Sequence, residues 1–401
     1  MASEARKAPL QFGIKLRRTL CGRAGWGGLV LQLLFAALIV WLGYEIYANA
    51  TTNLQNQRVA SGFGFLSQTA GFGVSQSLIP YSESDSYARV FLVGLVNTLV
   101  VAAVGIVFAT LIGFAVGIGR LSRNWLVARI SGGYVELIRN LPLLFQILFW
   151  YLAVLGALPG PRQSISLFDE IFISNRGLVL PRPIPHDGLT VFLAAIAGAA
   201  VAALGLRGYA RRRLFREGRP LTIWPYVLAL LIGLPMLAVL AFGTPFSIEV
   251  PRLRGFNFAG GLRVVPEFVA LALALSTYTA AFIAENVRAG IQSVSRGQME
   301  AGESLGLSHG ATLRLIVVPQ AMRVILPPLT NQYLNLTKNS SLAVAIGYPD
   351  LFSVFAGTTL SQTGQAIEII AITMGVYLLI SVVTSVAMGL YGRRVNRSLG
   401  R

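Results

Sequence analysis

The sequence predicts an all-α integral membrane protein with about eight transmembrane helices. Hydrophobic residues make up 54% of the 401-residue chain and charged residues only 12%. That charged fraction is about half of what a typical soluble domain carries. The mean hydropathy is +0.65. Long apolar runs alternate with short basic segments along the whole sequence, which is the pattern of membrane helices and their connecting loops.

Eight apolar segments are long enough to span a bilayer, for which a helix needs roughly 20 mostly apolar residues. The predicted spans are 29–48, 90–118, 135–157, 189–206, 222–243, 266–288, 312–336 and 367–391. The seventh is the least apolar, because prolines and amides interrupt it. These are Pro319, Pro327, Pro328, Asn331, Gln332 and Asn335. We expect a helix break at Pro327–Pro328, where two successive backbone N–H groups are missing.

The distribution of basic residues predicts the orientation. An even number of spans places both termini on one side of the membrane. Most of the 33 Lys and Arg residues then fall on that same side, in the N-terminal tail and in 120–129, 207–219, 288–296 and 393–401. Because cytoplasmic loops are enriched in Lys and Arg, we predict that both termini are cytoplasmic and that Lys338 lies outside. The basic tail and the long apolar run after it favour a retained anchor over a cleaved signal peptide.

Several function classes are disfavoured by composition. The net charge of +17 would suit a nucleic-acid partner, but the basic residues lie between apolar runs rather than on one soluble basic domain. We therefore expect no nucleic-acid partner. The single cysteine, Cys21, excludes an internal disulfide, and with only His186 and His309 we expect no metal site.

Three polar segments read as loops. Residues 49–88 contain two Gly-Phe phrases, and residues 158–188 are rich in proline. Glycine and proline mark both as loops on the outer membrane surface. The six arginines of 207–219 predict an inner loop that contacts lipid headgroups or acts as a retention signal.

Between the sixth and seventh spans, the loop 290–311 predicts a short cytoplasmic helix. Ser295 followed by Gln298 is a capping-box pattern. Glu300 then falls in the first turns, where the helix dipole favours an acid, and Gly306 is a natural stop. A helix of about ten residues is unstable alone, so it must pack on the spans, on a partner, or on both. Spacing alone does not separate a plain connector from a docking element.

This loop resembles the EAA loop of permease subunits in bacterial binding-protein-dependent ABC importers. The matching residues are Glu300, Ala301, Gly306, Ile316 and Pro319, while Gly302 and Val318 depart from the pattern of the family. The segments 134–146, 277–290 and 336–342 are similar to signatures of the polar amino-acid permeases, the histidine and glutamine permease-like group. The resemblance covers 90–157 and 266–391. The length and layout are closest to the larger permease of general L-amino-acid transporters.

The resemblance implies a type I ABC importer fold with a five-helix core in a bacterial inner membrane. It implies three kinds of protein partner: a second homologous permease, two ATP-binding subunits and a periplasmic amino-acid-binding protein. Membrane lipid surrounds the chain. No cofactor is expected on this chain, because it has no phosphate-binding loop motif; ATP and Mg would be used by the partner ATPase, and the chain itself would not be an enzyme. One sequence does not distinguish a heterodimer of permeases from a homodimer, nor does it identify the amino acids carried.

We expect six segments along the chain. They are a cytoplasmic tail, 1–28; an extra span with a periplasmic segment, 29–88; the first part of the permease core, 90–157; an insertion with periplasmic loops and two extra spans, 158–265; the second part of the core with the coupling loop, 266–391; and a cytoplasmic tail, 392–401. The expected contacts to the ATPase come from residues of the coupling loop: Gln298, Glu300, Ala301, Gly302, Ser304, Leu305 and Gly306.

Polar residues within the spans are candidates for a substrate path or for helix pairing. Glu136 and Arg139, and likewise Glu285 and Arg288, are three residues apart and can pair on one helix face. Such pairs serve either as gates or as structural ties. The candidate path residues are Asn97, Gln146, Tyr278, Asn331 and Asn335. Each of them can instead make a plain interhelical hydrogen bond.

Two other function classes fit an apolar chain of this size. An ion-coupled secondary amino-acid transporter is the main alternative, but it would need no docking helix and often carries an acid deep in a span. A membrane-embedded enzyme would need a metal-ligand or nucleophile motif, and none is evident.

Overall fold

The computed structural model describes residues 26–56, 62–218 and 221–398. Within these ranges, seven helical segments are long and apolar enough to cross a membrane, and a bent pair makes up to eight. The segments are α2 (Trp26–Asn56), α3 (Tyr87–Gly119), α6 (Leu189–Glu217), α7 (Trp224–Phe242), α8 (Pro266–Gln292), the run α10, η4 and α11 (His309–Asn339), and α13 (Ala366–Ser398). The predicted all-α membrane fold is confirmed. Most of the predicted N-terminal tail lies outside the described residues.

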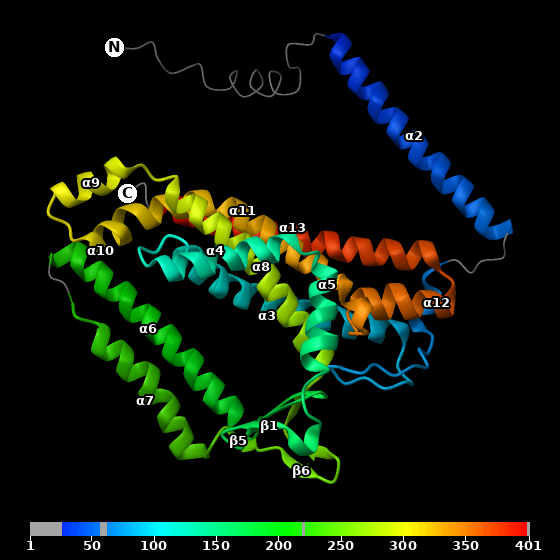
Figure 1. Ribbon diagram of the computed structural model, residues 1–401, viewed down its shortest axis with the longest axis horizontal. Helices are drawn as coiled ribbons and strands as arrows, with labels where there is room; N and C mark the ends of the chain where they lie inside the picture. Colours follow the sequence, from blue (N-terminus) through cyan, green and yellow to red (C-terminus); the bar gives the residue numbers. More distant parts are fainter. Residues whose placement is uncertain (1–25, 57–61, 219–220, 399–401) are drawn as a thin grey trace.

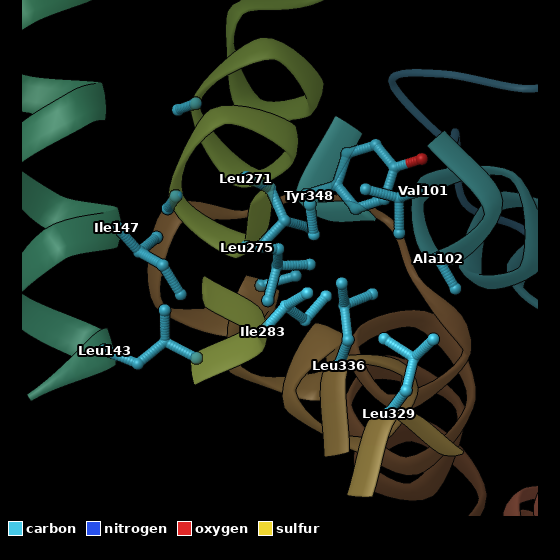
Figure 2. Packing of buried hydrophobic residues seen from close by; sticks show 14 of the residues in the cluster. Val101, Ala102, Leu143, Ile147, Leu271, Leu275, Ile283, Leu329, Leu336 and Tyr348 are labelled. Atoms are coloured by element: carbon cyan, nitrogen blue, oxygen red, sulfur yellow. The ribbon is translucent and has the colours of Figure 1, made fainter. Parts of the chain in front are cut away.

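The core of the bundle is built around α8. Its residues Ala270, Leu271, Ala274 and Leu275 are fully buried and pack against α3, α11 and the segment after it. Figure 2 shows Leu271 and Leu275 between Ile147 on one side and Val101 and Leu336 on the other. The ring of Tyr348 closes this cluster and is completely buried. The helix α8 is therefore the central element on which the others are assembled.

Close contact between α3 and its neighbours depends on glycine. A Cβ added to Gly113 would lie 2.6 Å from Cβ of Ile283, and one added to Gly117 would lie 2.8 Å from the carbonyl oxygen of Ala284. At Gly94 the obstacle is the backbone of Leu351. Small residues at such positions let membrane helices approach closely. The high glycine content of this chain thus serves helix packing at these positions.

The third predicted span, 135–157, is wrong as a single straight helix. Residues 125–155 form α4 (Trp125–Asn140), α5 (Leu143–Leu148) and the π-helical η2 (Phe149–Leu155), with a bend of 108° between α4 and the rest. The bend lies at Leu141, which precedes Pro142 and has extended backbone angles. A residue before proline is pushed out of the α region, and the proline itself donates no hydrogen bond.

Two further boundaries differ from prediction. The arginines of 207–216 do not lie in a loop but on the continuation of α6, which ends at a left-handed Gly218. At 29 residues, α6 is about 44 Å long and outreaches a hydrocarbon core of about 30 Å. The predicted C-terminal tail from residue 392 likewise continues α13 as far as Ser398.

The expected break at Pro327–Pro328 is also absent. The helix α11 (Val318–Asn339) is continuous through both prolines. The irregularity lies earlier instead, in the π-helical η4 (Leu313–Val317), which follows α10 (His309–Thr312). This π-helical turn lies directly before Pro319 at the start of α11, and proline at that position donates no hydrogen bond to the carbonyl four residues earlier.

The insertion contains small β-sheets that sequence analysis assigned to loops. One sheet has the order β1-β2-β3-β8, and two hairpins pair β4 with β5 and β6 with β7. Their strands are β1 (Ile165–Leu167), β2 (Ile171–Ser174), β3 (Gly177–Leu180), β4 (Arg182–Pro185), β5 (Phe246–Glu249), β6 (Arg252–Arg254), β7 (Asn257–Ala259) and β8 (Leu262–Val264). Proline is tolerated in β4 because that strand pairs on one side only.

The helices α6 and α7 pack mainly on each other and form a hairpin to one side of the bundle (Figure 1). The sheets close the base of this hairpin, because β4 precedes α6 and β5 follows α7. Strand β3 pairs with β8 in the register Leu178↔Val264. The two ends of the insertion therefore meet in one sheet, directly before α8.

The segment before α3 is not only a surface loop. It contains the 3-10 helix η1 (Phe63–Ser67), and Phe65 is 1% exposed. The Phe65 ring lies 6.2 Å from the rings of both Tyr87 and Phe355. The ring of Phe65 thus fills a second apolar cluster, which lies between the start of α3 and the π-helical η6 (Phe352–Thr359). The short helix α12 (Leu360–Thr363) follows η6.

The glycine contact between α3 and α8 can be tested by substitution. Gly113→Val places a branched side chain against Ile283 and the carbonyl oxygen of Ala280, and overpacking of this kind costs about 1–3 kcal/mol. We expect a lower unfolding temperature of the detergent-solubilised chain. Gly375→Val in α13 is the matched control, because nothing lies within 4 Å of its added Cβ. Equal unfolding temperatures for the two variants would contradict the contact.

Candidate functional site

The predicted short helix in 290–311 is present as α9 (Arg296–Ser304). It lies with α10 at the end of α8 opposite the β-sheets (Figure 1). Its C-terminus ends as predicted at Gly306, whose φ is +82°. The N–H of Gly306 donates to the carbonyl of Glu303, and the N–H of Leu307 donates to that of Gly302. This pair of bonds is a Schellman motif, which requires a residue in the left-handed region at position 306.

The predicted N-terminal cap of α9 is not formed. Ser295 has extended backbone angles but its side chain makes no capping hydrogen bond. The Gln298 side chain does not reach back either; it accepts a hydrogen bond of 3.1 Å from the amide of Gln320 in α11. Glu300 lies beyond the first turn of the helix, where the dipole effect has faded. The start of α9 is therefore held by a contact to α11 rather than by its own sequence.

The position of α9 on the bundle is set by Gly302. It is the only buried residue of α9, and an added Cβ would lie 2.7 Å from Cγ2 of Thr312 and 2.9 Å from Cδ1 of Ile316. The departure from the family pattern at this position, Gly for Ala, therefore serves close packing of α9 against α10 and η4.

The rest of α9 forms an exposed face. Apart from Gly302, the residues predicted for docking are all exposed: Gln298, Glu300, Ala301, Ser304, Leu305 and Gly306. Leu305 is 82% exposed at the tip of the helix. The carboxylate of Glu303 lies 3.0 Å from Nδ1 of His309 and ties the helix to α10. The arrangement presents an apolar tip beside a free carboxylate at Glu300, which is a surface suited to a protein groove.

The charged residues near this end of the bundle pair differently from prediction. Glu285 forms the predicted ion pair with Arg288, and it forms a second with Arg120 at the end of α3. No sequence signal connects residues 120 and 285. The predicted pair of Glu136 and Arg139 is absent from the ion pairs of the described residues. Instead, the Arg139 guanidinium lies over the Phe282 ring at 5.2 Å.

These groups surround an open cavity of about 740 Å³ between α4 and the ends of α3 and α8. Its charged lining consists of Arg120, Arg129, Glu136, Arg139 and Glu285. Ionisable side chains in membrane proteins usually pair with one another or line an open cavity, and this cluster does both.

Two of the predicted path residues have structural roles. The Asn97 amide donates to the carbonyls of Gln76 and Pro349, both at 2.9 Å. The Gln146 amide donates to the carbonyls of Ile138 and Leu141, at 3.0 and 3.1 Å. Gln146 thereby satisfies carbonyls that the bend at Pro142 leaves without helical partners, as backbone in a membrane requires. The NH2 groups of both side chains are thus occupied by backbone carbonyls, whereas Oδ1 of Asn97 and Oε1 of Gln146 are buried without a hydrogen-bond partner among the described residues.

The side chains of the other three predicted path residues are half-buried or exposed. Tyr278 is half-buried, with its ring 5.0 Å from that of Phe282. Asn331 and Asn335 are exposed on one face of α11. Lys338 is also exposed and extends this face, because positions i, i+4 and i+7 lie on one side of a helix. We call the exposed side chains of Asn331, Asn335 and Lys338 the polar stripe of α11.

Lys338, which the distribution of basic residues placed outside the membrane, lies level with the middle of α3. A Cβ on Gly105 would be 3.2 Å from the Leu336 side chain, and the hydroxyls of Thr110 and Tyr333 are 2.8 Å apart. The antiparallel helices α3 and α11 are therefore in register near Gly105, the middle of the 33-residue α3. Lys338 lies only about 3 Å beyond Leu336 along the axis. A cation at this depth costs at least about 2.5–3.5 kcal/mol unless it faces water or a partner.

Comparison with known proteins places the chain among transport proteins. A family model described as binding-protein-dependent transport system inner membrane component matches residues 105–397. The chain is 53% identical to the amino-acid ABC transporter permease protein YhdX of Escherichia coli, over 91% of this chain and 93% of that one. It is 49% identical to the general L-amino acid transport system permease protein AapQ of Rhizobium johnstonii, with 91% of each chain covered.

A third relative carries narrower substrates in its name. The glutamate/glutamine/aspartate/asparagine transport system permease protein BztB of Rhodobacter capsulatus is 42% identical, and 92% of each chain is covered. All three relatives thus match over nearly their whole length.

The close packing of Gly302 predicts a local effect of substitution. Gly302→Val should lift α9 from α10 and η4, and thereby separate Gln298 from Gln320. In a Cys21→Ser background, cysteines at 298 and 320 should be joined by a short bis-maleimide, and Gly302→Val should abolish that crosslink. Gly297→Val is the matched control, because nothing lies within 4 Å of its added Cβ. A persistent crosslink in Gly302→Val would contradict this packing.

The polar stripe of α11 predicts water access. In the same background, Asn331→Cys and Asn335→Cys should react with a charged, membrane-impermeant thiol reagent in native membranes. Val382→Cys in α13 is the control, since Val382 is exposed on an apolar helix and should face lipid. Protection of 331 and 335 to the same degree as 382 would show that the stripe lies in lipid or in a dry interface.

Proposed function

Since the chain belongs to the family of inner membrane components of binding-protein-dependent transport systems and is an amino-acid ABC transporter permease, we propose that it imports a broad range of L-amino acids. We further propose that ATP is hydrolysed by separate subunits and that these subunits dock on α9. The observation that carries the proposal is the exposed face of α9 on a multi-span bundle. A helix of nine residues, held by one buried glycine and a Schellman stop, is a rigid protrusion rather than a flexible connector.

The coupling argument is mechanical. A subunit that changes shape on binding ATP must transmit that motion through a contact that does not itself yield. Gly302 seats α9 against α10 and η4, and η4 continues without a break into α11. A force on Leu305 or Glu300 is therefore delivered directly to α11, which carries Asn331, Asn335 and Lys338. The docking helix packs on the same continuous helical run that carries the polar stripe.

The proposed orientation follows from charge. Placing α9 in the cytoplasm also places the arginine-rich end of α6 and the Arg120–Glu285–Arg288 cluster on that side, in agreement with the positive-inside rule. The end of α6 would then cross the headgroup layer, where its arginines contact anionic lipid. The β-sheets of the insertion would face the periplasm, on the side from which a substrate-binding protein delivers its cargo.

The full transporter would contain a second homologous permease, two ATP-binding subunits and a periplasmic amino-acid-binding protein. ATP and Mg would be bound by the ATP-binding subunits. The wide substrate range is proposed from the relative that is named as a general L-amino acid permease, whereas the BztB relative is named for acidic amino acids and their amides.

Uptake into proteoliposomes tests the proposal. The chain, reconstituted with its partner subunits and binding protein, should accumulate labelled L-amino acids from a panel only when ATP is supplied on the α9 side. Accumulation driven by a sodium or proton gradient at zero ATP would instead establish an ion-coupled secondary transporter. Restriction of uptake to a single amino acid would contradict the broad range while leaving the ATP-driven mechanism intact.

Substitution in α9 tests the coupling surface. Glu300→Lys and Leu305→Asp reverse the charge and the polarity of the exposed face, and each should weaken ATPase association at least tenfold, which is about 1.4 kcal/mol. Glu83→Lys makes the same charge change in an exposed loop before α3 and should have no effect. Association is measured by pull-down of the ATPase from detergent. Normal association and substrate-stimulated hydrolysis in both α9 variants would place the coupling surface elsewhere.

A further inference from the structure

The four-stranded sheet of the insertion has one face that is entirely aliphatic. Residues directly opposite each other in antiparallel strands share a face, and alternate residues of a strand do too. The register of the sheet pairs Ile165 with Ile173 and Leu178 with Val264. One face therefore consists of the odd-numbered residues of β1 and β2 and the even-numbered residues of β3 and β8, and all of these are Ile, Leu or Val. We call it the aliphatic face.

The aliphatic face is the uncovered side of this sheet. Ile165 and Leu167 are 49% and 45% exposed, and no side chain of this face is buried by the described residues. The other face is the covered one, because Val179 is buried and the Phe172 ring lies 4.5 Å from the Phe258 ring of β7. An antiparallel sheet with one solvated face normally buries its apolar side. Here the apolar side is turned toward something outside the described chain.

The two-stranded sheet of β4 and β5 has the same property. Pro183 lies opposite Ile248. Pro185 lies opposite Phe246. These four apolar side chains therefore share one face, and all of them are exposed. The charged residues on the strands of the two sheets lie on the opposite faces; they are Arg182, Glu249 and Arg263.

The prolines of β4 also change the free edge of that strand. The N–H of His186 donates to the carbonyl of Pro245 in the ladder with β5. Because ladder positions alternate, the backbone at Pro183 and Pro185 points away from β5, where proline has no N–H to leave unpaired. An unpaired N–H is costly where water is scarce, as in lipid. Proline at an edge also prevents another strand from pairing there.

Three helices place both sheets at one membrane surface. The apolar part of α6, 189–206, is about 27 Å long and α7 is about 28 Å long, so each matches a hydrocarbon core of about 30 Å. In α8, Pro266 lies about 28 Å from Glu285, which pairs with Arg120 toward the opposite surface. Strands β4, β5 and β8 adjoin these helix ends in the chain, away from α9 (Figure 1). The sheets therefore lie at the boundary of the hydrocarbon core.

We propose that the insertion is a membrane-surface platform, in which the aliphatic face and the apolar face of β4 and β5 lie in the phospholipid interface opposite α9. Their polar faces are turned to the aqueous side, which the proposed orientation makes the periplasm. The platform continues the exposed apolar surface of the helical hairpin, to which Leu193 of α6 and Leu240 of α7 contribute near the sheets. It holds the base of that hairpin at a fixed depth.

The charge of the insertion suits a phospholipid surface. Segments 158–188 and 244–265 together contain six arginines and four acidic residues. All six arginines are exposed. Binding of an apolar face to a membrane is strengthened by basic residues when the lipids are anionic. The apolar faces and the surrounding arginines thus favour the same occupant, an anionic phospholipid leaflet.

A protein partner is the competing occupant, and the composition of the two faces argues against it. Protein interfaces are enriched in Tyr, Trp, Met and Arg and carry hydrogen bonds. The two apolar faces consist of Ile, Leu, Val and Pro with a single Phe, and they offer no polar side chain. A periplasmic binding protein must also dock and leave, whereas strongly apolar interfaces are typical of permanent complexes.

Fluorescence quenching tests the platform in the complete transporter, reconstituted in nanodiscs with cysteine-free partner subunits. In the Cys21→Ser background, bimane on Ile165→Cys or Ile248→Cys should be quenched by a phospholipid with a nitroxide high on its acyl chain. Ser166→Cys and Ser247→Cys are matched controls, because each is the exposed neighbour on the opposite face of the same strand. We expect lipid quenching at least threefold stronger at the two isoleucine positions, and the reverse ratio for aqueous iodide.

Every other pattern overturns the platform. Equal lipid quenching on the two faces would show that the sheets stand clear of the membrane. Loss of both lipid and iodide quenching at Ile165→Cys and Ile248→Cys would identify a dry contact with the second permease. Iodide quenching that disappears when the binding protein is added would identify the faces as its docking surface. Should Ile165→Cys fail to assemble, Leu167→Cys tests the same face in the same strand.

The platform and the proposed function fail separately, because quenching does not depend on transport. A transporter that imports amino acids but shows no difference between the two faces would contradict only the platform. A transporter that shows the expected quenching but imports no amino acid would contradict only the proposed function.

Discussion

Glycines 94, 113 and 117 of α3 leave no room for a Cβ, because neighbouring segments lie directly against the backbone of this helix, and a Cβ at Gly105 would press on the Leu336 side chain. In lipid there is no hydrophobic force to bring helices together, and close van der Waals contact takes its place. The contact fixes the depth of α8 against α3, and through Gly105 and Leu336 it fixes the register of α11 as well. The positions of Glu285, of the polar stripe and of α9 all depend on this registration.

Sequence reasoning found the parts of the fold that depend on composition and local pattern. The spans follow from apolar length, and the stop of α9 follows from Gly306, because both are set within a few residues. It missed what depends on contacts between residues distant in the chain. These are the ion pair of Arg120 with Glu285, the packing of Gly302 against α10 and η4, and the pairing of β3 with β8. It also predicted a break at Pro327–Pro328, whereas α11 is continuous through both prolines. The sequence does contain a signal for the bend, because Leu141 precedes a proline. The apolar composition of 135–157 outweighed that signal and led to the prediction of one straight span.

Polar residues in the bundle divide into two groups by whether their side chains hydrogen-bond to the protein backbone. Asn97, Thr98 and Gln146 spend their hydrogen bonds on the backbone of irregular segments: the Thr98 hydroxyl accepts from the N–H of Leu351 at 2.9 Å. Such residues make irregular backbone possible at membrane depth. Among the described residues, the side chains of Asn331, Asn335 and Lys338 make no such hydrogen bonds to the backbone, and they lie on an exposed face of α11. Residue type alone does not separate the groups, since both contain asparagine; only the three-dimensional partners do.

The antiparallel pairing of β3 with β8 brings together two points that are more than eighty positions apart in the chain. Everything between them, including the α6–α7 hairpin, leaves and re-enters the molecule at neighbouring strands. The hairpin therefore resembles an insertion into a shorter ancestral chain, because both of its ends meet at one pair of strands. A chain that lost the hairpin would need only one turn to join β3 to β8. The same architecture makes the base of the hairpin a natural junction for inserting a foreign domain, because the two ends of the insertion already meet at paired strands.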